Sequence, residues 1–203
     1  MTRLALAVVW LAVGSSATAG ERTYVVDAER SLVTIGVDKS GLFSFAGHAH
    51  EVLAPSVAGE VIADPGDLGR SSVRLSFQAV ALRVTGKGEP PEDVPKVQAK
   101  MISPEVLDAV RFPAITFHSV GVSGQAAGAG AWTLQVEGDF ALHGITKRMK
   151  LPLRAETTGD TLVVSGTLLL RQSAFGIKPV SVAGVVNVKD ELTITYRIVA
   201  QAR

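Results

Sequence analysis

The alternation of apolar and polar residues constrains this chain most, since it recurs with a period of two over much of the length. In the clearest stretch, every second position from Trp132 to Leu142 is apolar or glycine, and the positions between Trp132 and Phe140 are polar. Successive side chains of a β-strand point to opposite faces, so this pattern predicts a strand with one buried face. Residues 192–198 repeat it, with Leu192, Ile194, Tyr196 and Ile198 predicted to face inward.

Shorter runs of the same kind predict further strands, separated by glycine and proline turn signals. These strands are expected at residues 23–26, 32–38, 57–63, 72–84, 114–121, 149–155 and 161–170. The turn signals are Asp64-Pro65-Gly66, Gly128-Ala129-Gly130 and Gly159-Asp160.

Residues 91–110 break the strand pattern and predict two short helices. Apolar residues recur there at helical spacing, and Pro91 is suited to the start of the first helix. Ser103, followed by Pro104 and Glu105, has the composition of an N-cap for the second. The acidic, proline-rich residues 88–95 are expected to form an exposed loop.

About eight strands with short connections and one helical insertion favour a mainly all-β fold, an antiparallel up-and-down barrel. Residues 161–170 are apolar on both faces, which leaves two interpretations of the interior. Either side chains fill the barrel, or its interior holds one small apolar ligand.

The N-terminal residues predict a secretory signal peptide over residues 1–19. Arg3 supplies the positive region, residues 4–13 the apolar region, and Ala17-Thr18-Ala19 an A-x-A cleavage site. The apolar run is too short to span a membrane, so residues 20–203 are expected to form one domain, periplasmic or secreted, without a transmembrane segment. Loss of Arg3 makes the Lys and Arg residues equal in number to the 19 Asp and Glu residues. A neutral chain is an unlikely partner for nucleic acid.

The order of several motifs along the chain resembles the YceI-like family of polyisoprenoid-binding proteins. The motifs are Tyr24-Val25-Val26-Asp27, Val57-Ala58-Gly59-Glu60-Val61, Phe112-Pro113-Ala114-Ile115-Thr116-Phe117, Gly138-Asp139-Phe140-Ala141-Leu142-His143-Gly144 and Arg171-Gln172-Ser173-Ala174-Phe175-Gly176. The resemblance implies a lipocalin-like barrel in the bacterial periplasm that holds an isoprenoid lipid in an apolar tunnel. It implies no catalytic residue and no cofactor other than that lipid.

Aromatic residues are the candidates for the wall of such a tunnel or for the core beside it: Phe43, Phe45, Phe77, Phe117, Trp132, Phe140 and Phe175. Arg171 follows an apolar run, so its charge is expected at a barrel mouth or beside a carboxylate, where it is a candidate contact for a polar headgroup. The oligomeric state is open at this stage, with a homodimer among the options.

The histidines support an alternative, a metal-binding or metal-dependent protein. His48 and His50 can share one side of an extended segment, and His118 or His143 would have to complete the three or four ligands that zinc prefers. Structural histidines bonded to the backbone are the simpler interpretation. A hydrolase lacks support, because the chain has no Cys and no Gly-x-Ser-x-Gly motif, and Ser119 and His118 face opposite ways in a strand.

Overall fold

A computed structural model describes residues 20–40, 49–182 and 186–203. The predicted signal peptide lies outside the described residues, as do the candidate site residues Phe43, Phe45 and His48. No helix in the described part of the chain is long and apolar enough to cross a membrane.

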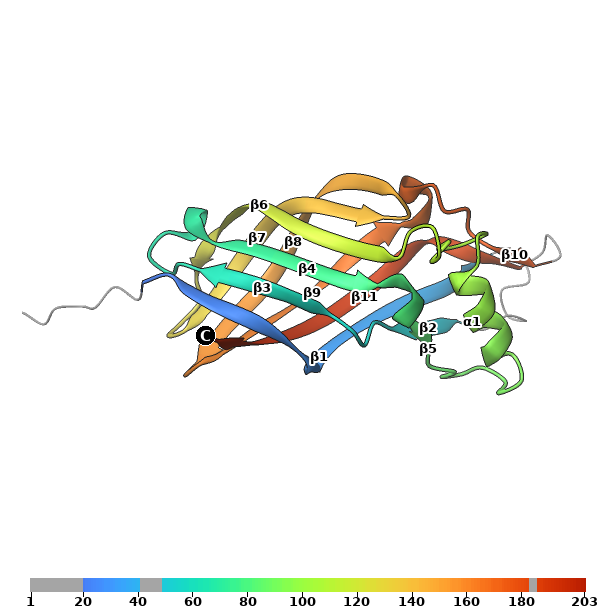
Figure 1. Ribbon diagram of the computed structural model, residues 1–203, viewed down its shortest axis with the longest axis horizontal. Coiled ribbons are helices and arrows are strands. Elements are labelled where there is room, and N and C mark those ends of the chain that lie inside the picture. Colours follow the sequence, from blue (N-terminus) through green and yellow to red (C-terminus); the bar gives the residue numbers. More distant parts are fainter. Residues whose placement is uncertain (1–19, 41–48, 183–185) are drawn as a thin grey trace, which may run out of the picture.

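Strands dominate the described chain and form one antiparallel sheet that closes on itself (Figure 1). The strands are β1 (Arg22–Ser40), β2 (His50–Leu53), β3 (Ala58–Ala63), β4 (Ser72–Gln78), β5 (Arg83–Val84), β6 (Ala114–Ala126), β7 (Ala131–Leu142), β8 (Ile145–Thr158), β9 (Thr161–Arg171), β10 (Ser181–Val182) and β11 (Val186–Ala202). The helical elements are α1 (Val94–Ile102) and the short 3-10 helices η2 (Leu68–Arg70), η3 (Ala79–Ala81) and η4 (Gln172–Phe175).

Closure comes from the pairing of β11 with β1, which joins the two sides of the sheet. β3 pairs with the first part of β1 and β2 with the second, so together they take the place of one interrupted strand. β4 and β5 together take the place of the next strand of the barrel, because β4 pairs with β3 and β5 pairs with β2. The result is the predicted antiparallel barrel of eight strands.

The inward faces agree with the alternation of the sequence. On β7 and β11, the predicted inward residues from Trp132 to Leu142 and from Leu192 to Ile198 face the barrel interior, apart from Gly138, which has no side chain. Gly138 is opposite Ser119 in the pairing of β7 with β6, and a Cβ there would overlap the ring of Phe117 and the backbone of His118. The close approach of the two strands therefore requires glycine at this position.

Two strands that the sequence predicts separately are one strand in the structure. β1 runs through residues 27–31, with an irregularity in its pairing to β11 between Asp27 and Leu32. The Ser31 hydroxyl donates to the carbonyl of Asp27 at 2.6 Å and accepts from the amide of Val199 at 3.0 Å. These bonds satisfy backbone groups at the bulge, so the strand continues.

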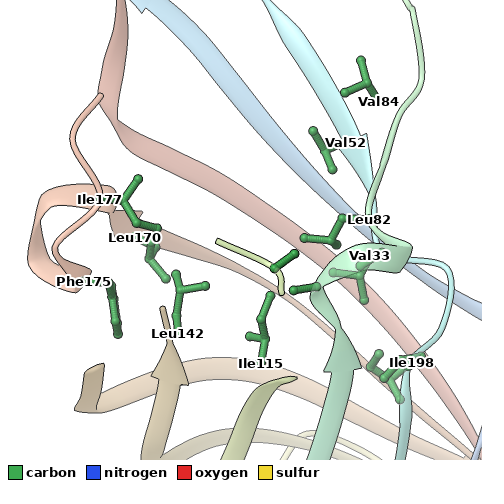
Figure 2. Close-up of a cluster of buried hydrophobic side chains, with 14 residues drawn as sticks. Val33, Val52, Leu82, Val84, Ile115, Leu142, Leu170, Phe175, Ile177 and Ile198 are labelled. Carbon is green, nitrogen blue, oxygen red and sulfur yellow. The ribbon is translucent and has the colours of Figure 1, made fainter. Parts of the chain in front are cut away.

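The barrel has two distinct ends, on opposite sides of the molecule (Figure 1). At the α1 end, α1 contacts β5, and β2 and β10 are drawn at the same end of the molecule. At the η2 end lie the C-terminus and the turn Asp64-Pro65-Gly66 before η2. Near the α1 end, buried residues from β1, β2, β5, β6, β9 and η4 form the largest hydrophobic cluster, with Leu142, Leu170, Phe175 and Ile177 gathered on one side of it (Figure 2).

The prediction of a second helix after Ser103 is wrong. Ser103 ends α1, because its amide and its hydroxyl both donate to the carbonyl of Lys100, at 3.2 and 2.8 Å. The chain then turns back on α1, with the amide of Leu107 donating to Met101 and that of Ala109 to Ile102. Asp108 takes a positive φ of 45°, which a helix cannot include. The same Ser-Pro pair that is typical of a helix start here follows a helix end.

Candidate functional site

The barrel encloses an apolar cavity of about 520 Å³ that runs between its two ends. Its wall is built from inward side chains of nearly every strand, together with Val97 and Met101 of α1. Val61, Val136 and Ile198 are examples of wall residues that are almost fully buried. The volume lies within the range of about 300–1,000 Å³ that is usual for small-molecule sites. Of the two interpretations of the interior, the structure therefore matches the barrel with room for a ligand.

Four of the predicted aromatic residues line this cavity: Phe77, Phe117, Trp132 and Phe140. Trp132 lies toward the η2 end, since it is opposite Ala126 in β6 and Ala155 in β8. Phe117 and Phe140 are opposite each other in the pairing of β6 with β7, and Phe77 lies beyond their level toward the α1 end. The aromatic side chains are thus spread along the cavity rather than gathered at one mouth.

Phe175 and Arg171 are placed elsewhere. Phe175 is 2% exposed and packs edge-on against Phe140, with ring centroids 5.6 Å apart, so it supports the wall from outside the cavity. Arg171 is exposed and opposite Glu191 in the pairing of β9 with β11. It follows the inward Leu170 by one residue, so alternation directs it outward, and it does not line the cavity.

The described histidines lie in three different places. His118 is exposed on β6, opposite Asp139. His143 occupies the turn between β7 and β8, with its Nδ1 3.1 Å from the carbonyl of Phe175 and its ring against Phe112. His50 lines the cavity at the α1 end. Among the described residues, no group of three or more His, Cys, Asp or Glu side chains could hold a metal ion.

His50 contacts a buried carboxylate that the sequence does not reveal. Its Nδ1 lies 2.9 Å from Oε1 of Glu89, and the Glu89 side chain is 1% exposed. The two atoms are not aligned for a hydrogen bond, so His50 Nδ1 and both Glu89 carboxylate oxygens are buried without a hydrogen-bond partner in the described structure. Leaving buried polar atoms unpaired is costly, which marks this pair as unusual.

A glycine-flanked turn brings Glu89 inward. Gly86 and Gly88 have φ of 76° and 78°, a conformation that glycine adopts without strain. The turn is fixed to β2 from outside: the amide of Thr85 donates to the carbonyl of Glu51, and the Lys87 ammonium lies 3.2 Å from the Glu51 carboxylate. The sequence predicts an exposed loop over residues 88–95, but the side chain of Glu89 in this loop is buried.

The polar side chains at the η2 end are instead hydrogen-bonded to backbone amides. Asp64 is 8% exposed, and its Oδ1 accepts from the amides of Gly66 and Asp67 at 3.0 and 3.1 Å. The amide of Asp64 donates to the Ser71 hydroxyl at 3.0 Å. Both Asp64 and Ser71 line the cavity, but their side chains are already hydrogen-bonded within the turn.

The pairing of β8 with β9 ends halfway along the barrel. It runs from Thr158 to Leu153, which is opposite Gly166, and does not continue toward the α1 end. Pro152 comes next in β8 and has no amide to donate. The end of the Tyr196 side chain lies against Gly166, and its hydroxyl is 3.4 Å from the carbonyl of Pro152. Burial raises the pKa of Tyr196 to about 12.

A family model for the YceI-like domain matches residues 24–200 of the chain. Three solved structures share its fold. BcnA from Burkholderia cenocepacia is 20% identical with a TM-score of 0.68, over 87% of this chain and 99% of that one. A polyisoprenoid binding domain from Saccharophagus degradans, implicated in plant cell wall breakdown, is 12% identical with a TM-score of 0.65, over 89% and 98%.

The third structure is a YceI protein from Campylobacter jejuni, 12% identical with a TM-score of 0.54, over 75% of this chain and 84% of that one. No curated protein is similar enough to this chain to count as a match. At these identities the structural likeness concerns the fold alone.

Proposed function

This chain belongs to the YceI-like domain family, and we propose that it is a carrier that holds an apolar, isoprenoid-like lipid in the barrel cavity and catalyses no reaction. The observation that carries the proposal is the cavity of about 520 Å³, whose wall is almost entirely apolar. Together with the predicted signal peptide, this favours a protein of the periplasm or the cell exterior.

The shape of the cavity suits a long, narrow ligand. Wall residues come from both ends of the barrel, for example Trp132 toward the η2 end and Leu192 toward the α1 end. A polyisoprenoid tail is apolar and extended, so it can bury its length along such a wall. The name of the Saccharophagus degradans domain, a polyisoprenoid binding domain, is consistent with a ligand of this class.

Titration with prenyl alcohols of increasing length tests the proposal. Burial of apolar carbon contributes about 0.8 kcal/mol per methylene, and ordering of the tail offsets much of it. A net gain of about 1.4 kcal/mol per prenyl unit would tighten binding about ten-fold. We expect affinity to rise with each unit, then to level off when the cavity is full, with little dependence on salt. Affinity that ignored chain length and fell steeply with salt would contradict a carrier of apolar lipid.

A search for the natural ligand complements the titration. Native mass spectrometry of the protein purified without a His-tag, followed by lipid extraction, should show a bound apolar lipid. Elemental analysis of the same sample tests the metal alternative, which the separate positions of His50, His118 and His143 do not favour. Stoichiometric zinc or copper would reverse the order of the two hypotheses.

Residues that a hydrolase would need have structural roles here. The Ser119 hydroxyl accepts from the amide of Val73 at 2.8 Å, at the point where β4 leaves β6. The neighbouring His118 is on the outer face of β6. Incubation with ester and phosphoester forms of a bound prenyl alcohol should leave both unchanged.

A further inference from the structure

We propose that His50 and Glu89 form the site that recognises the polar head of the ligand, and that this head carries a hydroxyl group. The proposal rests on the carrier function above and adds the chemistry and the position of the head. It places the head at the α1 end and the tail toward the η2 end.

His50 is positioned to meet a ligand. It is opposite Val37 in the pairing of β1 with β2, and alternation directs it to the same side as Val52, into the barrel. Its side chain is 23% exposed, and no hydrogen bond to its Nε2 is found among the described residues. It is therefore one of the few polar groups in a mostly apolar wall.

Glu89 determines which kind of head His50 accepts. In the neutral imidazole, a carboxylate beside Nδ1 favours the tautomer with its proton on that nitrogen, which leaves Nε2 as an acceptor. The 2.9 Å separation is already within hydrogen-bond distance, and we expect the two groups to align into a hydrogen bond when a head binds. An acceptor at Nε2 requires a donor on the ligand, and a hydroxyl is such a donor. Glu89 is a positioning residue, since it acts through His50.

The charges around this mouth argue against an anionic head. Glu89 is a buried acid whose charge would repel a phosphate. The two lysines that line the cavity here are already paired with acids of their own: Lys96 with Asp93 at 2.8 Å and Lys100 with Glu105. The positive charges of both lysines are thus already paired with acids in the absence of a ligand.

The test compares four ligands that share prenyl chemistry: farnesol, farnesyl methyl ether, farnesyl phosphate and squalene, which has no polar head. With the wild-type protein, we expect farnesol to bind about ten-fold tighter than its methyl ether, because the ether leaves the buried acceptor unpaired. Farnesyl phosphate should bind more weakly than farnesol. Squalene should bind, since it tests only the apolar cavity.

Two variants should change this order and two controls should not. Glu89→Gln keeps the size of the side chain but removes the charge, so the preference for the alcohol should shrink to a few-fold and the penalty on the phosphate should fall. His50→Leu should make alcohol and ether equal. Glu92→Gln, an exposed acid three residues away, and His118→Ala, an exposed histidine, should retain the wild-type ratios.

The outcomes separate the two proposals. Binding of squalene and all three farnesyl compounds with equal affinity would overturn the head site and leave the carrier function standing. So would a preference for the phosphate, which would assign the mouth to Lys96 and Lys100. An alcohol preference that survived in Glu89→Gln and His50→Leu would also overturn it. No binding of any of the four would overturn both.

Discussion

The two ends of the barrel differ in whether a buried acid has hydrogen-bond partners. At the η2 end, Asp64 is 8% exposed and its carboxylate accepts two backbone amides, which fixes the turn before η2. At the α1 end, the Glu89 side chain is more deeply buried, yet neither of its oxygens has a hydrogen-bond partner among the described residues. One acid is part of the fold and the other is kept at a cost to it.

The two ends also differ in how completely their strands are paired. Between β8 and β9 the pairing extends from the η2 end to Gly166 and is absent from there to the α1 end. The α1 helix has no fully buried residue, and it is attached through Gln98, which bonds the amide of Val84 and the carbonyl of Leu82. Elements with few buried contacts open at lower free energy than the core. We therefore expect the ligand to enter at the α1 end, while the η2 end stays closed.

Removal of the Asp64 carboxylate should have the largest effect on stability. Asp64→Ala leaves the amide of Gly66 without its acceptor and the amide of Asp67 with only the backbone carbonyl of residue 64, at 3.3 Å, and unpaired buried groups cost about 1–3 kcal/mol each before solvation. We expect a loss of about 2–3 kcal/mol in the free energy of unfolding, measured by urea denaturation. Asp67→Ala is the matched control: Asp67 is an exposed N-cap of η2, whose removal should cost about 1 kcal/mol. Equal costs would mean that the η2 end is not held by its buried acid.

Narrowing the cavity at each end in turn should locate the entrance. Ala155→Leu narrows the η2 end, so we expect a loss of about ten-fold in affinity for a long prenyl alcohol and little change for a short one. Val37→Phe narrows the α1 end beside His50 and should weaken both ligands alike. Thermal unfolding of each variant controls for overpacking, which alone costs about 1–3 kcal/mol. The reverse pattern would place the entrance at the η2 end.

The barrel and much of its wall can be predicted from the sequence, because alternation on β7 and β11 depends on burial alone. Phe117, Trp132 and Phe140 follow from it as wall residues. Phe175 does not, since it follows β9 in η4, where the period of two no longer applies. Arg171 is directed outward by the alternation of β9 itself, a signal that the apolar run before it obscured.

Glu89 could not be found in this way. An acid among prolines and glycines is typical of an exposed loop, and its burial depends on the positive φ of Gly86 and Gly88 and on the distant anchor at Glu51. The pair Gly86 and Gly88 is a signal for a tight turn, but it does not show which side chain the turn brings inward. The second helix failed for a related reason. The Ser103 hydroxyl donates backward to the carbonyl of Lys100 and accepts forward from the amide of Glu105, yet no helix follows, because Asp108 takes a positive φ.

Removal of the Glu89 carboxylate should change the free energy of unfolding in the opposite direction to removal of the Asp64 carboxylate. Glu89→Leu eliminates a buried acid whose carboxylate oxygens lack a hydrogen-bond partner, and an acid buried in this way is costly to keep in the folded state. We expect the free energy of unfolding to rise by about 1 kcal/mol, measured in urea as above. Glu92→Leu, at an exposed position, should change it by less than about 0.5 kcal/mol. A destabilised Glu89→Leu protein would show that the acid supports the fold at the α1 end as Asp64 does at the other.

The smallest effect at neutral pH should come from Tyr196, which lies where the pairing of β8 and β9 stops. Its hydroxyl is 3.4 Å from the Pro152 carbonyl, a long and weak hydrogen bond, so Tyr196→Phe should cost less than about 0.5 kcal/mol at pH 7.

Alkaline pH should make the role of Tyr196 visible. Burial raises the pKa of Tyr196 to about 12 in the folded protein, against about 10 when unfolded. Between these values the unfolded chain releases the proton and the folded chain keeps it, so stability falls as the pH rises above 10. The slope cannot exceed about 1.4 kcal/mol per pH unit and should be smaller, because solvent reaches part of the ring. Urea unfolding of wild type and Tyr196→Phe at several pH values from 9 to 11.5 measures the difference. We expect the wild-type curve to fall relative to that of Tyr196→Phe above pH 10 and then to cross it. Curves that stayed parallel would show that the Tyr196 hydroxyl is solvated and does not bridge the gap toward the α1 end.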